Sequence, residues 1–409
     1  MKKSAAITGT QCRQGTLGAA PLIEALSRTM RPRIVCDNKI PFLRGALEPY
    51  AEVVYLPGKE TTAELVKDAD ALITRTRTAC NASLLEGSKV RVIATATIGF
   101  DHIDTAWCEA HGIIWRNAPG CNSWSVKQYV TALLVALAQK RGLKLDGMTL
   151  GVVGVGNVGS KVAEAAEILG MKVLLNDPPR ERECRDGNPF VSLNEIIRRS
   201  DIITLHVPLQ KEGPDATWHL FDAARLAQMR PSQILINSSR GPVVDNKALK
   251  AALKAGALKA ACLDVWEGEP DLDPELVDLL DFSTPHIAGY SADGKANGTT
   301  AAVRVVASVL GLPLTDWKAT GVPAPPQSTE FEIDAAGHSV QDVLTEAVLH
   351  TYDISADSDA LRADLSAFER LRGDYPIRRE FDSFTVSLMG GTAEMASRLS
   401  KLGFGVKSL

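Results

Sequence analysis

Basic clusters and long apolar runs are both scarce in this sequence of 409 residues. Lysine plus arginine (45) are slightly outnumbered by aspartate plus glutamate (49), and no basic block is present that could neutralise a phosphate backbone. The sequence therefore predicts no nucleic-acid partner. The longest nearly apolar run, Tyr129–Ala138, is about half of what a bilayer-spanning helix needs, so no membrane association is expected.

The seven cysteines are dispersed along the chain and include no close pair at metal-ligand spacing. This usage is typical of reduced thiols in the cytoplasm, so we expect neither a disulfide framework nor a metal site. Residues Ser4–Gly18 contain no continuous apolar core, which argues against a secretory signal. A cytoplasmic protein is therefore expected.

The features that are present indicate a globular chain with more than one domain. Hydrophobic residues make up 45% and charged residues 23%. At about 150 residues per domain, the length corresponds to two or three domains. From Arg33 onward, short β-branched runs such as Leu72–Ile73 and Val92–Ala94 alternate with helical patterns. This alternation predicts an α/β fold built from βαβ units around parallel sheets.

A second α/β series begins near Thr149, after a helix expected over Ser123–Lys140 with Ser123 as its N-cap. The proline-rich residues Val322–Pro326 mark a linker. Beyond this linker the pattern predicts a small α+β module with two helices and one strand, over Val340–Tyr352, Ala393–Leu402 and Phe384–Leu388.

A glycine motif, GVGNVG, follows the first strand of the second series and opens a helix. Its glycines are Gly154, Gly156 and Gly159, and Asp177 lies 18 residues after the last of them, at the end of the next strand. This context is typical of a dinucleotide site, where glycines allow a tight turn and close approach to the pyrophosphate. Because Asp177 would accept hydrogen bonds from the ribose and repel a 2′-phosphate, NAD is the expected cofactor.

Three polar side chains follow later strands of the same series: Arg240, Glu269 and His286. In an open α/β sheet, ligands bind outside the carboxyl ends of the strands. His286 would exchange a hydroxyl proton, Arg240 would hold a carboxylate, and Glu269 would pair with the imidazole. Each residue alone also fits an ordinary structural role, but together they indicate hydride transfer on a hydroxy acid.

The segments that contain these residues, SSRGPVVD, LDVWEGEP and PHIAGY, resemble the D-isomer-specific 2-hydroxyacid dehydrogenases. Further segments are similar to one branch of that group, the erythronate-4-phosphate dehydrogenase family. They include ATATIGFDHID (94–104), NAPGCN (117–122), NDPPR (176–180), HIAGYSADGKANGTT (286–300) and SKLGF (400–404). The resemblance extends from about Arg33 to near the C-terminus.

The resemblance implies roles for individual residues. Arg240, Glu269 and His286 become the catalytic set, with His286 as the acid/base. Substrate-contacting positions are Thr76, Thr97 and Tyr290. NAD-contacting positions are Gly154, Gly156, Asn157, Val158, Gly159, Asp177, Val207, Ser239, Asp264 and Gly289.

One further candidate comes from the residues themselves. Arg75 and Arg77 directly follow the strand Leu72–Ile73, and alternation would point both to one side if the strand extends that far. We predict that Arg75 contacts the phosphate or the carboxylate of the substrate. A solvated loop arginine is an equally good interpretation of this residue.

The resemblance also implies an architecture of two Rossmann-like or flavodoxin-like lobes with parallel sheets, plus a small C-terminal α+β dimerisation domain. The boundaries follow: an N-terminal extension (1–32), a substrate domain (33–122 and 283–321), an NAD-binding domain (123–282) and a dimerisation domain (322–409). The implied partner is a small phosphorylated 2-hydroxy acid, and the implied assembly is a homodimer.

The implied activity is NAD-dependent oxidation of 4-phospho-D-erythronate to 2-oxo-3-hydroxy-4-phosphobutanoate, in the biosynthesis of pyridoxal 5′-phosphate (vitamin B6). Two alternatives stay open from the sequence. One is another D-2-hydroxyacid dehydrogenase, of the 3-phosphoglycerate or glyoxylate type. The other is a non-catalytic dinucleotide-binding protein like the co-repressors that share this fold.

Overall fold

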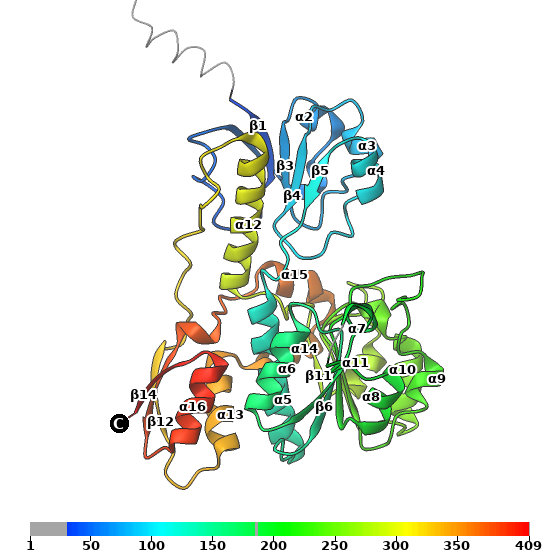
Figure 1. Cartoon of the computed structure of the whole chain (residues 1–409), viewed down its shortest axis with the longest axis vertical. Coiled ribbons are helices and arrows are strands. Elements are labelled where there is room, and N and C mark those ends of the chain that lie inside the picture. The colour runs from blue at the N-terminus through cyan, green and yellow to red at the C-terminus, as the bar shows by residue number, and fades with distance from the viewer. Residues whose placement is uncertain (1–30, 185–186, 409) are drawn as a thin grey trace, which may run out of the picture.

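The computed structural model describes residues 31–184 and 187–408, which form three parallel sheets with helices between the strands (Figure 1). The predicted α/β fold is confirmed. The expected N-terminal extension lies outside the described residues except for its last two positions. Among the helices of the described ranges, none combines the length and apolar character that crossing a membrane requires.

The first sheet has five strands in the order β2-β1-β3-β4-β5. Its strands are β1 (Arg33–Asp37), β2 (Glu52–Leu56), β3 (Ala71–Thr74), β4 (Val92–Thr95) and β5 (Ile114–Arg116). The helices of this lobe are α2 (Ala63–Val66), α3 (Ala82–Leu85), α4 (Thr105–Ala110) and α12 (Ala292–Leu310). Successive side chains point to opposite faces, so Ile34 belongs to the same hydrophobic cluster as Val303 of α12, while Val35 belongs to the cluster that contains Leu84 of α3. Helix α12 thus returns from late in the chain to complete the lobe (Figure 1).

The second sheet has six strands in the order β11-β10-β9-β8-β6-β7. They are β6 (Thr149–Val153), β7 (Lys172–Asn176), β8 (Ile202–Leu205), β9 (Ile234–Asn237), β10 (Ala260–Leu263) and β11 (Phe282–Ser283). Its helices are α6 (Gly159–Ile168), α7 (Pro178–Glu183), α8 (Leu193–Arg199), α9 (Ala223–Leu226), α10 (Asn246–Lys254) and α11 (Pro274–Leu279). Because β7 and β8 lie on opposite sides of β6, the strand order reverses there and opens a crevice at the carboxyl ends.

Helix α5 (Ser123–Arg141) precedes this sheet and is buried along nearly its whole length. It is apolar on most sides because α6 contacts it on one side and α13 on another. The predicted N-cap, Ser123, is wrong: Asn122 occupies that position. The Ser123 hydroxyl instead donates a hydrogen bond to the carbonyl of Gly120, at 2.8 Å.

The third sheet has three strands in the order β12-β13-β14. These are β12 (Glu330–Asp334), β13 (Thr385–Met389) and β14 (Gly405–Ser408). Its helices are α13 (Val340–Thr351) and α16 (Ala393–Leu402), whereas α14 (Ile354–Ala363) and α15 (Phe368–Gly373) of the same C-terminal segment contribute Leu361 and Phe368 to a core of the second sheet. The two predicted helices are confirmed within one residue, whereas α14 and α15 are additional. Because all three strands are parallel, the small C-terminal module is built from βαβ crossovers.

Candidate active site

The three predicted catalytic side chains follow the carboxyl ends of neighbouring strands in the second sheet. Arg240 follows β9, Glu269 lies in the loop after β10, and His286 lies just beyond β11. Nδ1 of His286 is 2.8 Å from Oε2 of Glu269, and the two side chains are 32% and 21% exposed. With Nδ1 directed at the carboxylate, Nε2 of the imidazole is the nitrogen left to exchange a proton with a ligand.

The Glu269 carboxylate is held in its ionised form. Burial alone would raise its pKa, but the hydrogen bond and the charge of His286 outweigh burial and keep the pKa of Glu269 below its ordinary value. The backbone N–H of Trp266 donates a further hydrogen bond to Oε1, at 3.0 Å. An ionised carboxylate at this position stabilises the imidazolium that forms when His286 accepts a proton.

Asp264 fixes the backbone around His286. His286 has a φ of +57°, a left-handed conformation that is uncommon for a residue with a Cβ. The next two backbone N–H groups, of Ile287 and Ala288, donate to the two carboxylate oxygens of Asp264 at 2.7 and 3.0 Å. Burial raises the pKa of Asp264, and these bonds partly oppose that effect. Asp264 therefore supports the histidine loop. This structural role is separate from the NAD contact that the resemblance implies for Asp264.

Arg378 also holds this loop. It belongs to the C-terminal module and is only 3% exposed. Its Nη2 donates to the carbonyls of Ile287 and Ala288 at 3.1 and 2.6 Å, and to the Ser125 hydroxyl at 2.7 Å. Arg378 is thus a positioning residue for His286. Sequence reasoning missed it because an arginine outside any motif gives no local signal of what it will contact.

Arg240 connects the second sheet with the first lobe. Its Nη1 donates to the carbonyl of Ser239 at 2.8 Å, and its Nη2 lies 3.8 Å from Oδ2 of Asp101. A Cβ added to Gly99 would lie 2.9 Å from the same nitrogen. The predicted substrate contact Thr97 donates a hydrogen bond to the carbonyl of Gly99 at 2.9 Å. The structure therefore brings Arg240 and the Thr97 loop together across the two lobes.

The predictions for the segment after β3 need one correction. Strand β3 ends at Thr74 and a bend begins at Thr76, so the expected strand alternation does not apply to Arg75 and Arg77. Thr76 is exposed. Arg75 contacts the carbonyl of Lys39 at 3.4 Å, while Arg77 forms an ion pair with Glu369 of α15. The two arginines consequently have different partners.

The glycine motif has the geometry of a phosphate-binding turn. Gly154 has a φ of +86°, and a Cβ there would lie 2.7 Å from the carbonyl of His206 and 2.8 Å from the Val207 side chain. A Cβ at Gly159 would lie 1.9 Å from the carbonyl of Gly154. At Gly156, by contrast, an added Cβ would meet nothing within 4 Å, so this glycine leaves open space at the N-terminus of α6. The turn fits the pyrophosphate of a dinucleotide.

Asp177 lies at the end of β7, beside this turn. Its Oδ2 accepts a hydrogen bond from the N–H of Val155 at 2.8 Å, and its Oδ1 accepts from the N–H of Arg180 at 3.1 Å. These bonds hold the carboxylate at the edge of the crevice, where ribose hydroxyls can reach it.

The remaining predicted NAD contacts form two groups. Asn157, Val158 and Val207 lie at the glycine turn, whereas Ser239 and Gly289 lie on the histidine side of the crevice. Gly289 has a packing role as well, because a Cβ there would lie 2.1 Å from the side-chain nitrogen of Asn122.

Two glycine substitutions separate folding from cofactor binding. Gly159→Ala places a methyl group against the Gly154 carbonyl, so we expect a lower melting temperature of the free protein and weak NAD binding. Gly156→Ala is expected to keep the melting temperature but to weaken NAD affinity about tenfold or more, because the methyl group points into open space that the pyrophosphate would fill. Thermal unfolding and NAD titration measure the two effects. Equal melting temperatures for Gly159→Ala and the wild type would contradict the packing argument.

Comparison with known proteins identifies the class. Residues 115–288 match the family model described as D-isomer specific 2-hydroxyacid dehydrogenase, NAD binding domain, and residues 325–403 match a domain of unknown function. The structure of D-lactate dehydrogenase from Aquifex aeolicus, complexed with NAD and lactic acid, is similar with a TM-score of 0.57 at 27% identity, over 71% of this chain and 100% of that chain. An NADPH-dependent glyoxylate/hydroxypyruvate reductase from Sinorhizobium meliloti is similar with a TM-score of 0.57 at 25% identity, over 68% of this chain and 94% of that chain. Fold and site therefore define an NAD-dependent dehydrogenase of the 2-hydroxyacid class.

Curated relatives narrow the class further. The erythronate-4-phosphate dehydrogenase of Bacteroides fragilis is 51% identical over 355 residues, which covers 87% of this chain and 99% of the relative. The enzyme of the same name from Escherichia coli O157:H7 is 42% identical over 376 residues, covering 91% of this chain and 98% of the relative. The chain belongs to the erythronate-4-phosphate dehydrogenase family.

Proposed function

We propose that this enzyme oxidises 4-phospho-D-erythronate to 2-oxo-3-hydroxy-4-phosphobutanoate with NAD as acceptor, in the biosynthesis of pyridoxal 5′-phosphate. The observation that carries the proposal is the 2.8 Å contact between His286 and Glu269 at the strand ends, together with the Arg240 guanidinium there. A proton acceptor and a carboxylate-binding cation are the two groups that oxidation of a 2-hydroxy acid requires from the protein.

In this proposal each side chain has a defined task. Bound NAD would supply the hydride acceptor. Arg240 binds the C1 carboxylate of the substrate and orients C2. His286 removes the proton of the C2 hydroxyl through Nε2, and Glu269 stabilises the resulting imidazolium. Asp264 and Arg378 hold the histidine loop, so that Nε2 keeps its position during turnover.

Initial rates of NADH formation test the substrate. We expect kcat/KM for 4-phospho-D-erythronate to exceed the values for 3-phosphoglycerate and glycolate, the substrates that correspond to the alternative dehydrogenase types. Equal or better turnover of 3-phosphoglycerate would overturn the assignment. An enzyme that binds NAD but oxidises no 2-hydroxy acid would instead favour a dinucleotide sensor.

The Glu269→Gln variant tests the role of the carboxylate. Because the hydrogen bond and the charge of His286 keep the pKa of Glu269 below its ordinary value, the carboxylate stays ionised to a lower pH than usual. The variant replaces this anion by a neutral amide, so the imidazolium that forms when His286 accepts the substrate proton loses its counter-charge. We expect kcat for oxidation to be about 10- to 100-fold lower, with unchanged NAD affinity, as measured by steady-state rates and an NAD titration. Wild-type kcat in the variant would contradict the stated role.

We also propose that residues 33–122 with 283–321 form the substrate domain, residues 123–282 the NAD-binding domain and residues 322–409 a dimerisation domain.

The C-terminal sheet supports the proposed dimerisation domain. Helices α13 and α16 lie between it and α5 (Figure 1), while the central strand β13 keeps Thr385 and Ser387 half-buried and Met389 exposed. A second copy of the chain could cover this outer face.

We also propose a cytoplasmic location. The five buried cysteines of the described ranges form no disulfide, as is usual in a reducing compartment: Cys36, Cys80, Cys108, Cys121 and Cys262.

A further inference from the structure

Two cationic side chains from distant parts of the chain, Lys295 and Arg372, lie over the ring of Tyr290, next to the histidine loop. Nζ of Lys295, in the first turn of α12, is 4.9 Å from the centre of the Tyr290 ring and 5.9 Å from the centre of the Tyr375 ring. Cζ of Arg372, in α15, is 5.6 Å from the centre of the same Tyr290 ring. Two cations thus contact the face of one tyrosine.

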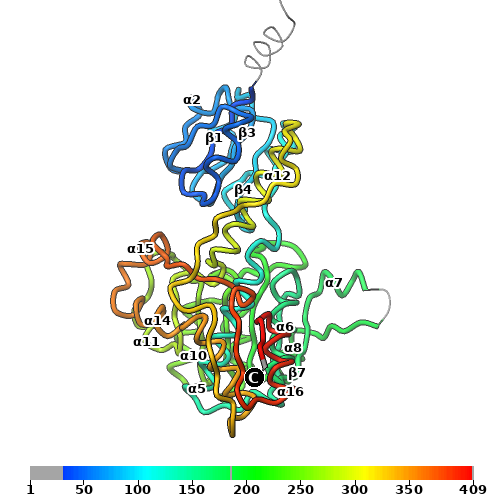
Figure 2. The backbone as a smooth tube through the Cα atoms, turned by 90° about the vertical axis from the view of Figure 1, so that its left-hand side faces the viewer, coloured from blue at the N-terminus to red at the C-terminus, as the bar shows by residue number. Residues whose placement is uncertain are grey.

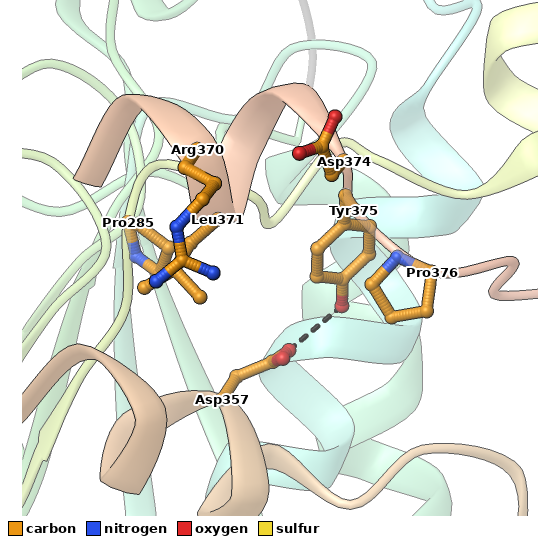
Figure 3. Close-up of a pocket in the computed structure, with 7 residues that line it drawn as sticks. All are labelled: Pro285, Asp357, Arg370, Leu371, Asp374, Tyr375 and Pro376. Atoms are coloured by element: carbon orange, nitrogen blue, oxygen red, sulfur yellow. Dashed lines mark hydrogen bonds between the residues drawn. The ribbon is translucent and has the colours of Figure 1, made fainter. Parts of the chain in front are cut away.

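The position of α15 explains how the C-terminal module reaches this place. Figures 1 and 2 both show α15 at the end of the lower body that faces the first lobe. The Arg77–Glu369 ion pair joins that lobe to α15, and Glu369 and Arg372 are neighbours on one helix face because they are three residues apart. Figure 3 shows that Arg370 and Leu371 of the same helix lie beside Pro285, with which they line a cavity of about 110 Å³. Since Pro285 precedes His286, α15 borders the catalytic loop directly.

Neither Lys295 nor Arg372 forms an ion pair with a carboxylate in the described part of the chain. Burial lowers the pKa of Lys295 to about 8, with smaller contributions from the charges of Arg75 and Arg378, and no carboxylate opposes the shift. Nε of Arg372 is buried without a hydrogen-bond partner. The charge of Arg372 also helps to lower the pKa of Glu269, which places its field at the catalytic pair. Lys295 and Arg372 are half-buried, and cations that are partly removed from water without an ion-pair partner are stabilised when an anion binds between them.

The proposed substrate carries two anionic groups, and Arg240 accounts for only one. We propose that Lys295 and Arg372 form the subsite that holds the phosphate group of the substrate; this inference rests on the proposed function. Lys295 would act as a compact point charge and Arg372 as a planar donor with at least one free N–H. The inference gives the C-terminal module a task at the active site of its own chain. The similar D-lactate dehydrogenase matches only 71% of this chain over its full length, so it has no counterpart for the rest.

The test compares a phosphorylated substrate with its unphosphorylated analogue in the full-length enzyme. For Lys295→Met and Arg372→Met we expect KM for 4-phospho-D-erythronate to rise about 10- to 100-fold each, because each variant removes a charge-assisted hydrogen bond to the phosphate. With D-erythronate, which lacks the phosphate, kcat/KM should change less than about twofold on the same scale. In Lys295→Arg, KM should stay close to the wild-type value, because the cation is kept. Lys89→Met is the control, because Lys89 is a cation paired with Asp68 and 70% exposed, and it should leave both constants unchanged.

Two results would overturn the subsite. One is an unchanged KM for 4-phospho-D-erythronate in the Lys295→Met/Arg372→Met double variant. The other is an equal loss with both substrates, which would indicate a general structural role; NAD affinity and melting temperature identify a variant that fails to fold. If the wild type does not oxidise 4-phospho-D-erythronate, the proposed function fails, and titration with inorganic phosphate then decides about the subsite. Binding that the double variant loses supports it, whereas no binding, or equal binding by both proteins, rejects it.

Discussion

Replacing His286 by alanine should lower kcat for oxidation of 4-phospho-D-erythronate by about 10³-fold, within the 10²- to 10⁴-fold range that a positioned acid/base contributes. NAD affinity should be unchanged, because the glycine turn and Asp177 do not depend on the imidazole. The loop should also keep its place, since Asp264 and Arg378 hold its backbone rather than the side chain of His286. Steady-state rates and an NAD titration measure the two quantities.

A suitable control is His338→Ala, because His338 is an exposed histidine outside the site. We expect wild-type kcat from this variant. If His286→Ala retained kcat within tenfold of the wild type, the proton would have another acceptor, and the assignment of His286 would be wrong.

Replacing Arg240 by methionine should lower kcat/KM by about 10³-fold. Removing one partner from a desolvated, hydrogen-bonded ion pair costs 2–5 kcal/mol, which corresponds to about 30- to 5000-fold. Arg240→Lys keeps the charge but not the fork that binds a carboxylate through two parallel hydrogen bonds, so it should recover only part of the loss. For both variants, kcat and KM are determined from initial rates over a range of substrate concentrations at saturating NAD.

The two Arg240 variants together distinguish the effect of the charge from that of the forked geometry. Wild-type kcat/KM in Arg240→Lys would show that charge alone suffices and would exclude the forked geometry. Wild-type kcat/KM in Arg240→Met would place the substrate carboxylate elsewhere.

Much of this site could be predicted from the sequence, because its signals are local. The glycine motif needs only a few consecutive residues. At Gly159, for example, a Cβ would collide with the carbonyl of Gly154 in the same motif. Arg240, Glu269 and His286 could be placed together because parallel strands end at one edge of a sheet. Helix α16 could be bounded correctly because a threonine cap precedes it and Gly403 follows it.

The residues that sequence reasoning missed are those that act across long separations. Arg378 reaches the carbonyl of Ala288 from 90 positions away along the chain, and nothing in its neighbourhood marks it as different from Arg379. Arg372 approaches Tyr290 only because α15 packs beside the histidine loop. The direction of the Arg75 side chain depends on where β3 ends. Strand ends are decided by pairing and packing rather than by the residues alone.

The most direct test of the account is a single turnover with 4-phospho-D-erythronate that carries deuterium at C2. If His286 removes the hydroxyl proton while C2 releases hydride, the NADH formed by the wild type must contain the deuterium in its nicotinamide ring, and the rate must be lower than with the undeuterated substrate. The His286→Ala variant should bind NAD but form almost no NADH in the same time. NADH without deuterium, or no NADH from the wild type, would contradict the account.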